Sequence, residues 1–147
     1  MRKPGFFLFF ILLPIFSTAM AEGRIYTSLF SNAAVGGYDP VAYFTQGRPV
    51  RGKNAHRAEY QGAIWYFASD EHRRMFQVDP EKYAPQYGGY CAWAVAHGGT
   101  ASGDPLQWSI YQDKLYLNYD ADIQKDWARD KAHWIEEADK NWPAVLK

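Results

Sequence analysis

The single cysteine, Cys91, is the feature of this sequence that most restricts what the chain can fold into. One thiol cannot close a disulfide within the chain, and it excludes the zinc sites that are built on pairs of CxxC cysteines. The fold must therefore depend on a hydrophobic core. A chain of 147 residues, 48% of them hydrophobic, is long enough to form such a core without a covalent or metal staple.

The charge balance argues against a nucleic-acid partner. The chain carries 16 basic and 16 acidic residues, which gives no net charge at neutral pH. A protein that binds nucleic acid needs a basic surface to displace the counterions of the phosphates, so no such partner is expected.

The first 21 residues resemble a secretory signal peptide. Two basic residues precede an apolar run at residues 6–16, and small residues follow at 17–21. The run is much shorter than the roughly 20 apolar residues of a membrane-spanning helix. We expect cleavage after Ala21, a periplasmic or secreted protein, and no membrane contact after cleavage. Residues 22–35 are expected to be a loosely ordered lead-in segment, and residues 36–147 to form one domain.

The first half of this domain reads as a hairpin followed by a helix. Two aromatic-rich runs, 55–60 and 63–68, are joined by the two-residue connection 61–62, whose glycine tolerates the positive φ of a tight turn. Ser69 is a good N-cap for a helix that must stop before Pro80.

The second half predicts a short helix, a second hairpin and a long helix. Residues 90–97 are read as a buried helical turn, and residues 108–111 and 115–119 as two strands with one alternating apolar face. Asp120 caps a C-terminal helix whose apolar residues recur at spacings of three, four and seven. The predicted class is α+β: two antiparallel β-hairpins with short helices and a long C-terminal amphipathic helix.

Cys91 and two histidines, His72 and His97, are the candidate metal ligands. A soft thiolate together with imidazole suits copper or zinc, and Cys91 precedes His97 by only six residues. The histidines show none of the closely spaced patterns that mark a metal site. Two other roles for the thiol stay open: a small hydrophobic core residue, or a nucleophile with a histidine base.

An aromatic cluster around the glycine pair 88–89 is the other candidate site. Tyr87, Tyr90 and Trp93 could line a ligand pocket or a partner surface, because such side chains combine an apolar body with a polar tip. They could equally belong to the core of a small aromatic-rich domain.

Several motifs of the chain resemble the YHS domain, most closely its exported bacterial branch. The resemblance covers roughly residues 36–146. The segments that carry it are Tyr38-Asp39-Pro40-Val41, Tyr60-Gln61-Gly62, Trp65-Tyr66-Phe67, Ser69, Asp79-Pro80-Glu81-Lys82-Tyr83, Tyr87-Gly88-Gly89-Tyr90-Cys91 and Asn141-Trp142-Pro143.

The resemblance implies a small, treble-clef-like core that binds metal through cysteines. This chain departs from that pattern at each implied ligand. Ala42 and Ala68 stand at two of the cysteine positions and His72 at the third, so only His72 could still bind a metal.

We expect a non-enzymatic periplasmic binding module that holds a transition metal such as copper or zinc through Cys91 with His72 or His97. The ligand set of one chain is incomplete, which leaves open a site shared across a homodimer. The alternative is a domain that binds a small ligand or a protein partner through the Tyr- and Trp-rich segment 83–93, with Cys91 structural. A third hypothesis is a thiol enzyme.

Overall fold

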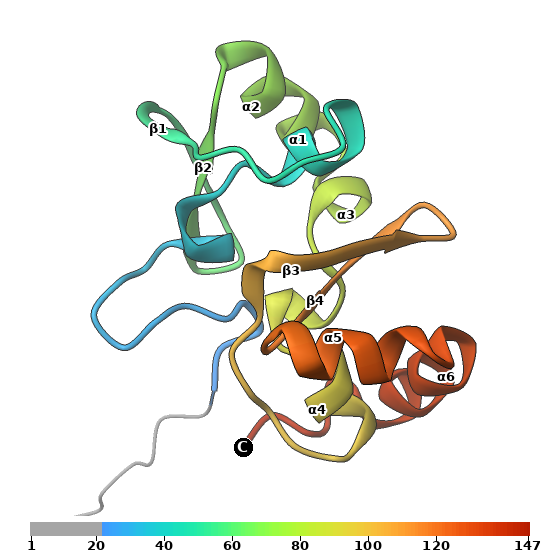
Figure 1. The fold of residues 1–147 in the computed structure, drawn as a ribbon. Helices are drawn as coiled ribbons and strands as arrows, with labels where there is room; N and C mark the ends of the chain where they lie inside the picture. The colour runs from blue at the N-terminus through green and yellow to red at the C-terminus, as the bar shows by residue number, and fades with distance from the viewer. Residues whose placement is uncertain (1–21) are drawn as a thin grey trace, which may run out of the picture.

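The computed structural model describes residues 22–147, so the expected signal peptide lies outside the described residues. The described part is an α+β fold with two separate two-stranded antiparallel sheets, as predicted (Figure 1). Its elements are η1 (Ala34–Gly37), α1 (Pro40–Thr45), β1 (Lys53–Tyr60), β2 (Ala63–Phe67), α2 (Asp70–Val78), α3 (Pro80–Tyr83), η2 (Gln86–Gly89), α4 (Ala92–Ala96), β3 (Asp104–Tyr111), β4 (Lys114–Asn118), α5 (Ala121–Ala128) and α6 (Lys131–Asn141).

The β1–β2 hairpin and α2 form where the sequence predicts them. Gln61 and Gly62 both have positive φ, which matches the twist of a tight two-residue hairpin turn. The hydroxyl of Ser69 accepts a hydrogen bond from the backbone N–H of His72 and caps α2. Phe76 of α2 then packs on Trp65 of β2, and their ring centroids are 4.8 Å apart.

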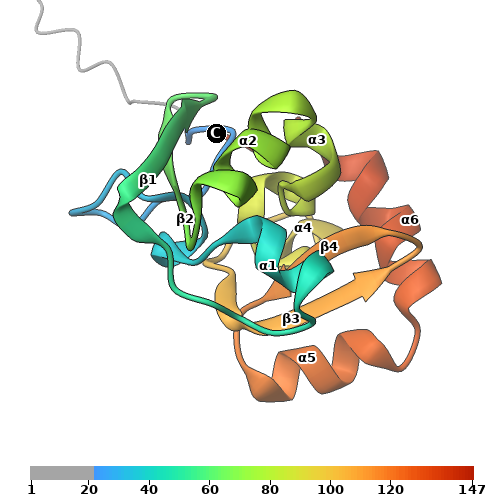
Figure 2. The same cartoon turned by 90° about the horizontal axis from the view of Figure 1, so that it is seen from above.

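Strand β4 separates two hydrophobic cores. Leu115 and Leu117 join the first core, which also holds Trp65 and Phe76, whereas Tyr116 belongs to a second core around Trp127. In both views β3 lies between α1 and α5 (Figure 1; Figure 2).

Burial on both faces of β4 replaces the single alternating face that the sequence predicts. Leu115, Tyr116 and Leu117 are all buried, while Tyr119, at the end of the predicted strand 115–119, is 53% exposed. A strand enclosed on both sides does not show the polar-apolar alternation of a half-exposed strand.

The prediction of one long C-terminal helix is wrong, because the segment folds as two helices. The side chain of Asp130 accepts a hydrogen bond from the backbone N–H of His133 and starts α6. The apolar spacing does not reveal the break, because Trp127 and Trp134, which lie on either side of it, are seven residues apart as in one continuous helix. Trp127 is buried beneath Tyr116, whereas Trp134 packs on α4.

The lead-in segment, residues 22–35, is better ordered than the sequence suggests. Ile25 is buried, and the backbone N–H of Tyr26 donates to the carbonyl oxygen of Gly88. Its far end is held by a bridge between Ala33 and Ile64 of β2. The intervening turn leaves the side chains of residues 29–30 almost fully exposed.

Candidate functional site

A buried carboxylate, Asp39, joins three elements of the first half of the chain. Its Oδ1 accepts hydrogen bonds from the backbone N–H groups of Val41 and Ala42, at 2.9 and 3.3 Å, and so caps α1. Its Oδ2 accepts from the N–H of Ala68 at 2.9 Å and lies 2.6 Å from Nδ1 of His72. The start of α1, the end of β2 and the first turn of α2 therefore meet at one side chain.

The Asp39–His72 contact orients the imidazole. When Nδ1 donates to Asp39, Nε2 of the neutral ring is left as an acceptor, and its neighbour is the hydroxyl of Thr45 at 3.4 Å. A histidine that binds a metal through one nitrogen commonly donates the other to a carboxylate or a carbonyl in this way. The His72 side chain is only 11% exposed.

The three positions that the resemblance assigns to metal ligands do converge here. Ala42, Ala68 and His72 all contact the carboxylate of Asp39. Two of them end in a methyl group with no donor atom, so the implied three-ligand set does not fit a metal ion in this chain. Within residues 22–147, no group of three or more His, Cys, Asp and Glu residues could hold a metal ion.

Cys91 lies in a different environment from both histidines. Its side chain is buried, 1% exposed, and its thiol contacts Oδ1 of Asn118 at 3.6 Å. Burial raises the pKa of the Cys91 thiol, although neighbouring backbone N–H groups favour the thiolate. The thiol is therefore protonated at neutral pH and packs as a small core residue.

His97 is separated from Cys91 by the length of α4. Cys91 precedes this helix and His97 follows it, and six helical residues rise by about 9 Å. Nδ1–H of His97 instead donates to the carbonyl oxygen of Trp93, 2.7 Å away. The ring stacks on Trp134 of α6, with ring centroids 4.9 Å apart. Cys91, His72 and His97 thus contact different partners, and within residues 22–147 they do not form a three-residue ligand group.

The aromatic candidates are mostly core residues. Tyr87 and Tyr90 are buried, and their hydroxyls donate to Asp139 and to the carbonyl oxygen of Gly23, each at 2.8 Å. Trp93 is half-buried against Trp134. Tyr87 and Tyr90 therefore use their polar tips to tie distant segments of the chain together.

The segment around Tyr87 nevertheless forms one wall of a cleft of about 360 Å³, here called the polar cleft. Five stretches of the chain line it: residues 24–25 of the lead-in segment, 60–61 of the first hairpin, 81–88, Lys114 and Trp142. Its charged residues, Arg24, Glu81 and Lys114, are exposed and form no ion pair within residues 22–147.

Gly88 sets how the lead-in segment borders this cleft. A Cβ atom on Gly88 would lie 1.7 Å from the carbonyl oxygen of Arg24, so only glycine permits this approach. Gly88 has a φ of +62°, and the preceding Tyr87 also lies in the left-handed region at +56°. No local signal in the sequence marks the cleft, because its lining residues are far apart along the chain.

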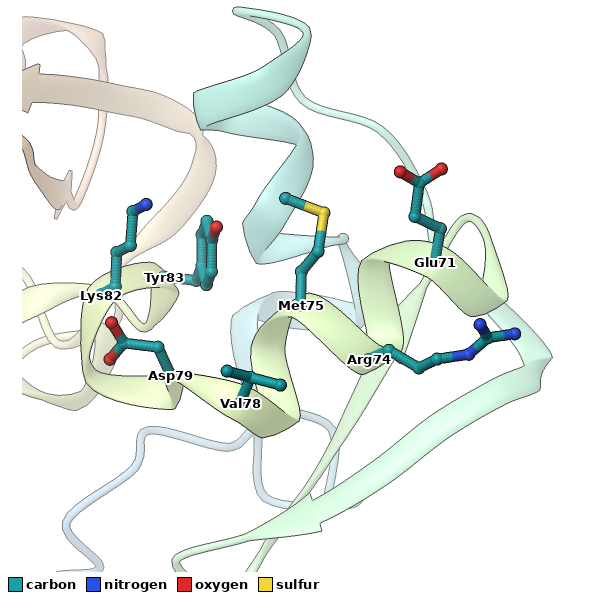
Figure 3. A pocket seen from close by; sticks show the side chains of 7 residues that line it. All are labelled: Glu71, Arg74, Met75, Val78, Asp79, Lys82 and Tyr83. Atoms are coloured by element: carbon teal, nitrogen blue, oxygen red, sulfur yellow. The ribbon is translucent and has the colours of Figure 1, made fainter.

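A second depression, the α2–α3 groove, has a volume of about 470 Å³ and a more apolar base (Figure 3). Met75, Val78 and Tyr83 line it, with charged side chains around them. Arg74 is engaged by Asp70, and the Lys82 ammonium lies 5.2 Å from the centroid of the Tyr83 ring. The cations of this groove are therefore occupied by their own neighbours, unlike those of the polar cleft.

Comparison with known proteins gives one match. Residues 41–87 match the family model of the YHS domain. The matched segment contains His72 and the 84–87 wall of the polar cleft, whereas Cys91 and His97 lie beyond it. No curated protein and no solved structure matches the chain. Within the described residues, no helix is both long and apolar enough to cross a membrane.

Proposed function

The chain carries a YHS domain at residues 41–87, and from this premise we propose that the protein is an exported, non-enzymatic binding module for a small polar molecule. The ligand occupies the polar cleft. Export rests on the signal-peptide pattern of residues 1–21.

The polar cleft is the observation that carries this proposal. Its walls come from the lead-in segment, both hairpins, the segment 81–88 and the C-terminal end of α6, so segments far apart in the sequence build it together. The walls are fixed before a ligand arrives: Tyr26 is hydrogen-bonded to Gly88, and the Tyr87 hydroxyl to Asp139. A preformed site of this kind does not lose affinity to the ordering of its own loops.

We propose a non-enzymatic protein because its reactive side chains are not in a state suited to catalysis. The pKa of the Cys91 thiol is raised by burial, which disfavours the nucleophilic thiolate. The carboxylate of Asp39 accepts hydrogen bonds from three backbone N–H groups and contacts the imidazole of His72. Neither residue lines the polar cleft.

The test is a ligand screen with a blocked cleft as its control. Protein from expression of the full-length chain is screened by thermal shift against organic acids, amino acids, sugars and nucleotides. A Gln86→Trp variant fills the cleft, and Gln77→Trp adds the same side chain on the exposed face of α2. A true ligand raises the melting temperature of the wild type and of Gln77→Trp but not of Gln86→Trp. Equal shifts in both variants, or no ligand from the panel, would overturn the proposal.

Transition-metal binding is a second candidate, favoured by the geometry of His72. Its Nδ1 is held by buried Asp39, which leaves Nε2 as the atom that could coordinate copper or zinc. Metal content and uptake of Cu(I) and Zn(II) test this role. Uptake that is lost in a folded His72→Gln variant and kept in Cys91→Ala would establish His72 as the ligand. Loss in Cys91→Ala instead would favour a thiolate site.

A further inference from the structure

Among the charged groups of the polar cleft, cations outnumber anions two to one. Arg24 and Lys114 line it together with a single acidic residue, Glu81. Neither cation is neutralised by an ion pair within the described residues. Elsewhere in the same chain, Arg73, Arg74, Arg129 and Lys140 each have a carboxylate partner.

Both cations are anchored on backbone that has little freedom. The carbonyl group of Arg24 packs so closely on Gly88 that the methyl group of an alanine at position 88 would overlap with it. Lys114 is the first residue of β4 and pairs with Tyr111 across a two-residue turn in which both central residues have positive φ. The two positive charges thus come from segments 90 residues apart in the sequence, and the fold brings both to one cleft.

The remaining lining combines aromatic rings with side-chain amides. Tyr60, Tyr87 and Trp142 provide aromatic surface, and the side-chain amides of Gln61 and Gln86 provide further hydrogen-bond donors. The volume of about 360 Å³ corresponds to about a dozen water molecules, which is the size of a small metabolite.

From these observations we infer that the ligand of the polar cleft is a small anion, bound through a carboxylate or phosphate group by Arg24 and Lys114. This inference rests on the proposed function and adds the chemical class of the ligand. Cation–anion hydrogen bonds in a partly enclosed cleft are stronger than neutral ones, so each cation should contribute measurably.

The experiment measures affinity for succinate, citrate and inorganic phosphate by calorimetry, with the neutral polyol glycerol as a control probe. Succinate and citrate report on carboxylate recognition, and phosphate on phosphoryl recognition. Arg24→Gln and Lys114→Gln each remove one positive charge from the cleft, whereas Lys125→Gln removes an exposed one from α5, outside it. Glu81→Gln removes the only carboxylate of the cleft and has the opposite expected effect.

We expect Arg24→Gln and Lys114→Gln each to weaken anion binding by about tenfold, the change produced by one charge-assisted contact. Glu81→Gln strengthens it, Lys125→Gln leaves it unchanged, and added salt weakens it. No binding of any of the three anions, or stronger binding after Lys114→Gln, would overturn the anion assignment. If another ligand still binds and Gln86→Trp blocks it, the proposed function stands and only its ligand class is wrong.

Discussion

The buried carboxylate of Asp39 lies 2.6 Å from Nδ1 of His72, at the junction of α1, β2 and α2. Its oxygens also accept hydrogen bonds from the backbone N–H groups of Val41, Ala42 and Ala68. A buried carboxylate is tolerated only where it is hydrogen-bonded, and this one has three backbone N–H partners in addition to the imidazole. The place where the family resemblance implies cysteine ligands is therefore held together by a carboxylate–imidazole pair.

Removing this carboxylate should strongly destabilise the protein. Asp39→Ala leaves the N–H of Ala68 and the ring of His72 without their partner, and the expected loss in the free energy of unfolding is about 3–5 kcal/mol. Urea denaturation measures the loss. Asp79→Ala is the matched control, because Asp79 is exposed and its side chain caps no helix. Similar losses in both variants would show that the Asp39 network is not a stabilising junction.

The thiol of Cys91 should be unreactive in the native protein. Burial raises its pKa, and the side chain is 1% exposed, so both the thiolate population and reagent access are low. A chromogenic disulfide reagent should react with one equivalent of thiol only after guanidinium unfolding. Rapid labelling of the folded protein at neutral pH would instead support a thiol-based activity.

Gly88→Ala should loosen the lead-in segment from the domain. The new Cβ would collide with the carbonyl oxygen of Arg24. This clash comes in addition to the free-energy cost of a left-handed backbone conformation for alanine. Gly47→Ala is the control, since Gly47 has a nearly identical φ of +65° with open space around it. The control should lose about 1 kcal/mol of unfolding free energy, and Gly88→Ala clearly more.

Limited proteolysis reads out the same change at the affected segment. Cleavage within residues 22–35 should be faster in Gly88→Ala than in Gly47→Ala or in the wild type. An unchanged cleavage rate would mean that the lead-in segment is not held by its contact with Gly88.

Alkaline pH should destabilise both hydrophobic cores, because Tyr43 lies in the first and Tyr87 and Tyr116 in the second. Burial raises the pKa of Tyr116 to about 12 from the ordinary value near 10, and the pKa values of Tyr43 and Tyr87 are raised as well. A group whose pKa is higher in the folded state stabilises fully below the unfolded value, and this stability is lost as the pH rises. The unfolding free energy should therefore fall from about pH 10 upward, by about 1.4 kcal/mol per pH unit for each such tyrosine.

Tyr116→Phe isolates the contribution of one hydroxyl to this dependence. The variant keeps the ring that packs on Trp127 and Tyr87, and it removes the titrating group. The slope of stability against pH between pH 10 and 12 should become shallower. An unchanged slope would assign the alkaline loss to other tyrosines.

Features that depend on neighbouring residues could be predicted from the sequence. The turn at Gln61 and Gly62 and the cap at Ser69 each depend on backbone and side-chain groups within four residues. Asp130 is also a local signal for the break, because aspartate is a favoured N-cap, but the apolar spacing runs across it and by itself predicts one helix.

The candidate sites depend on contacts that sequence spacing does not reveal. Cys91 and His97 are close in the sequence, yet α4 holds them apart, and their partners are Asn118 and Trp134 from later elements. The polar cleft joins Arg24 to Lys114, although nothing local relates these residues.

The sequence by itself determined the α+β class, both hairpins, the family resemblance and the loss of the cysteine ligands at Ala42 and Ala68. These follow from side-chain type and from interactions between near neighbours. Only the tertiary structure decided that β4 is buried on both faces, that Cys91 is a core residue and that the charges of the polar cleft meet. The physical reason is that the packing of whole helices and strands decides which side chains are buried and which charges meet. This packing is the sum of many weak contacts between residues that are distant in the chain.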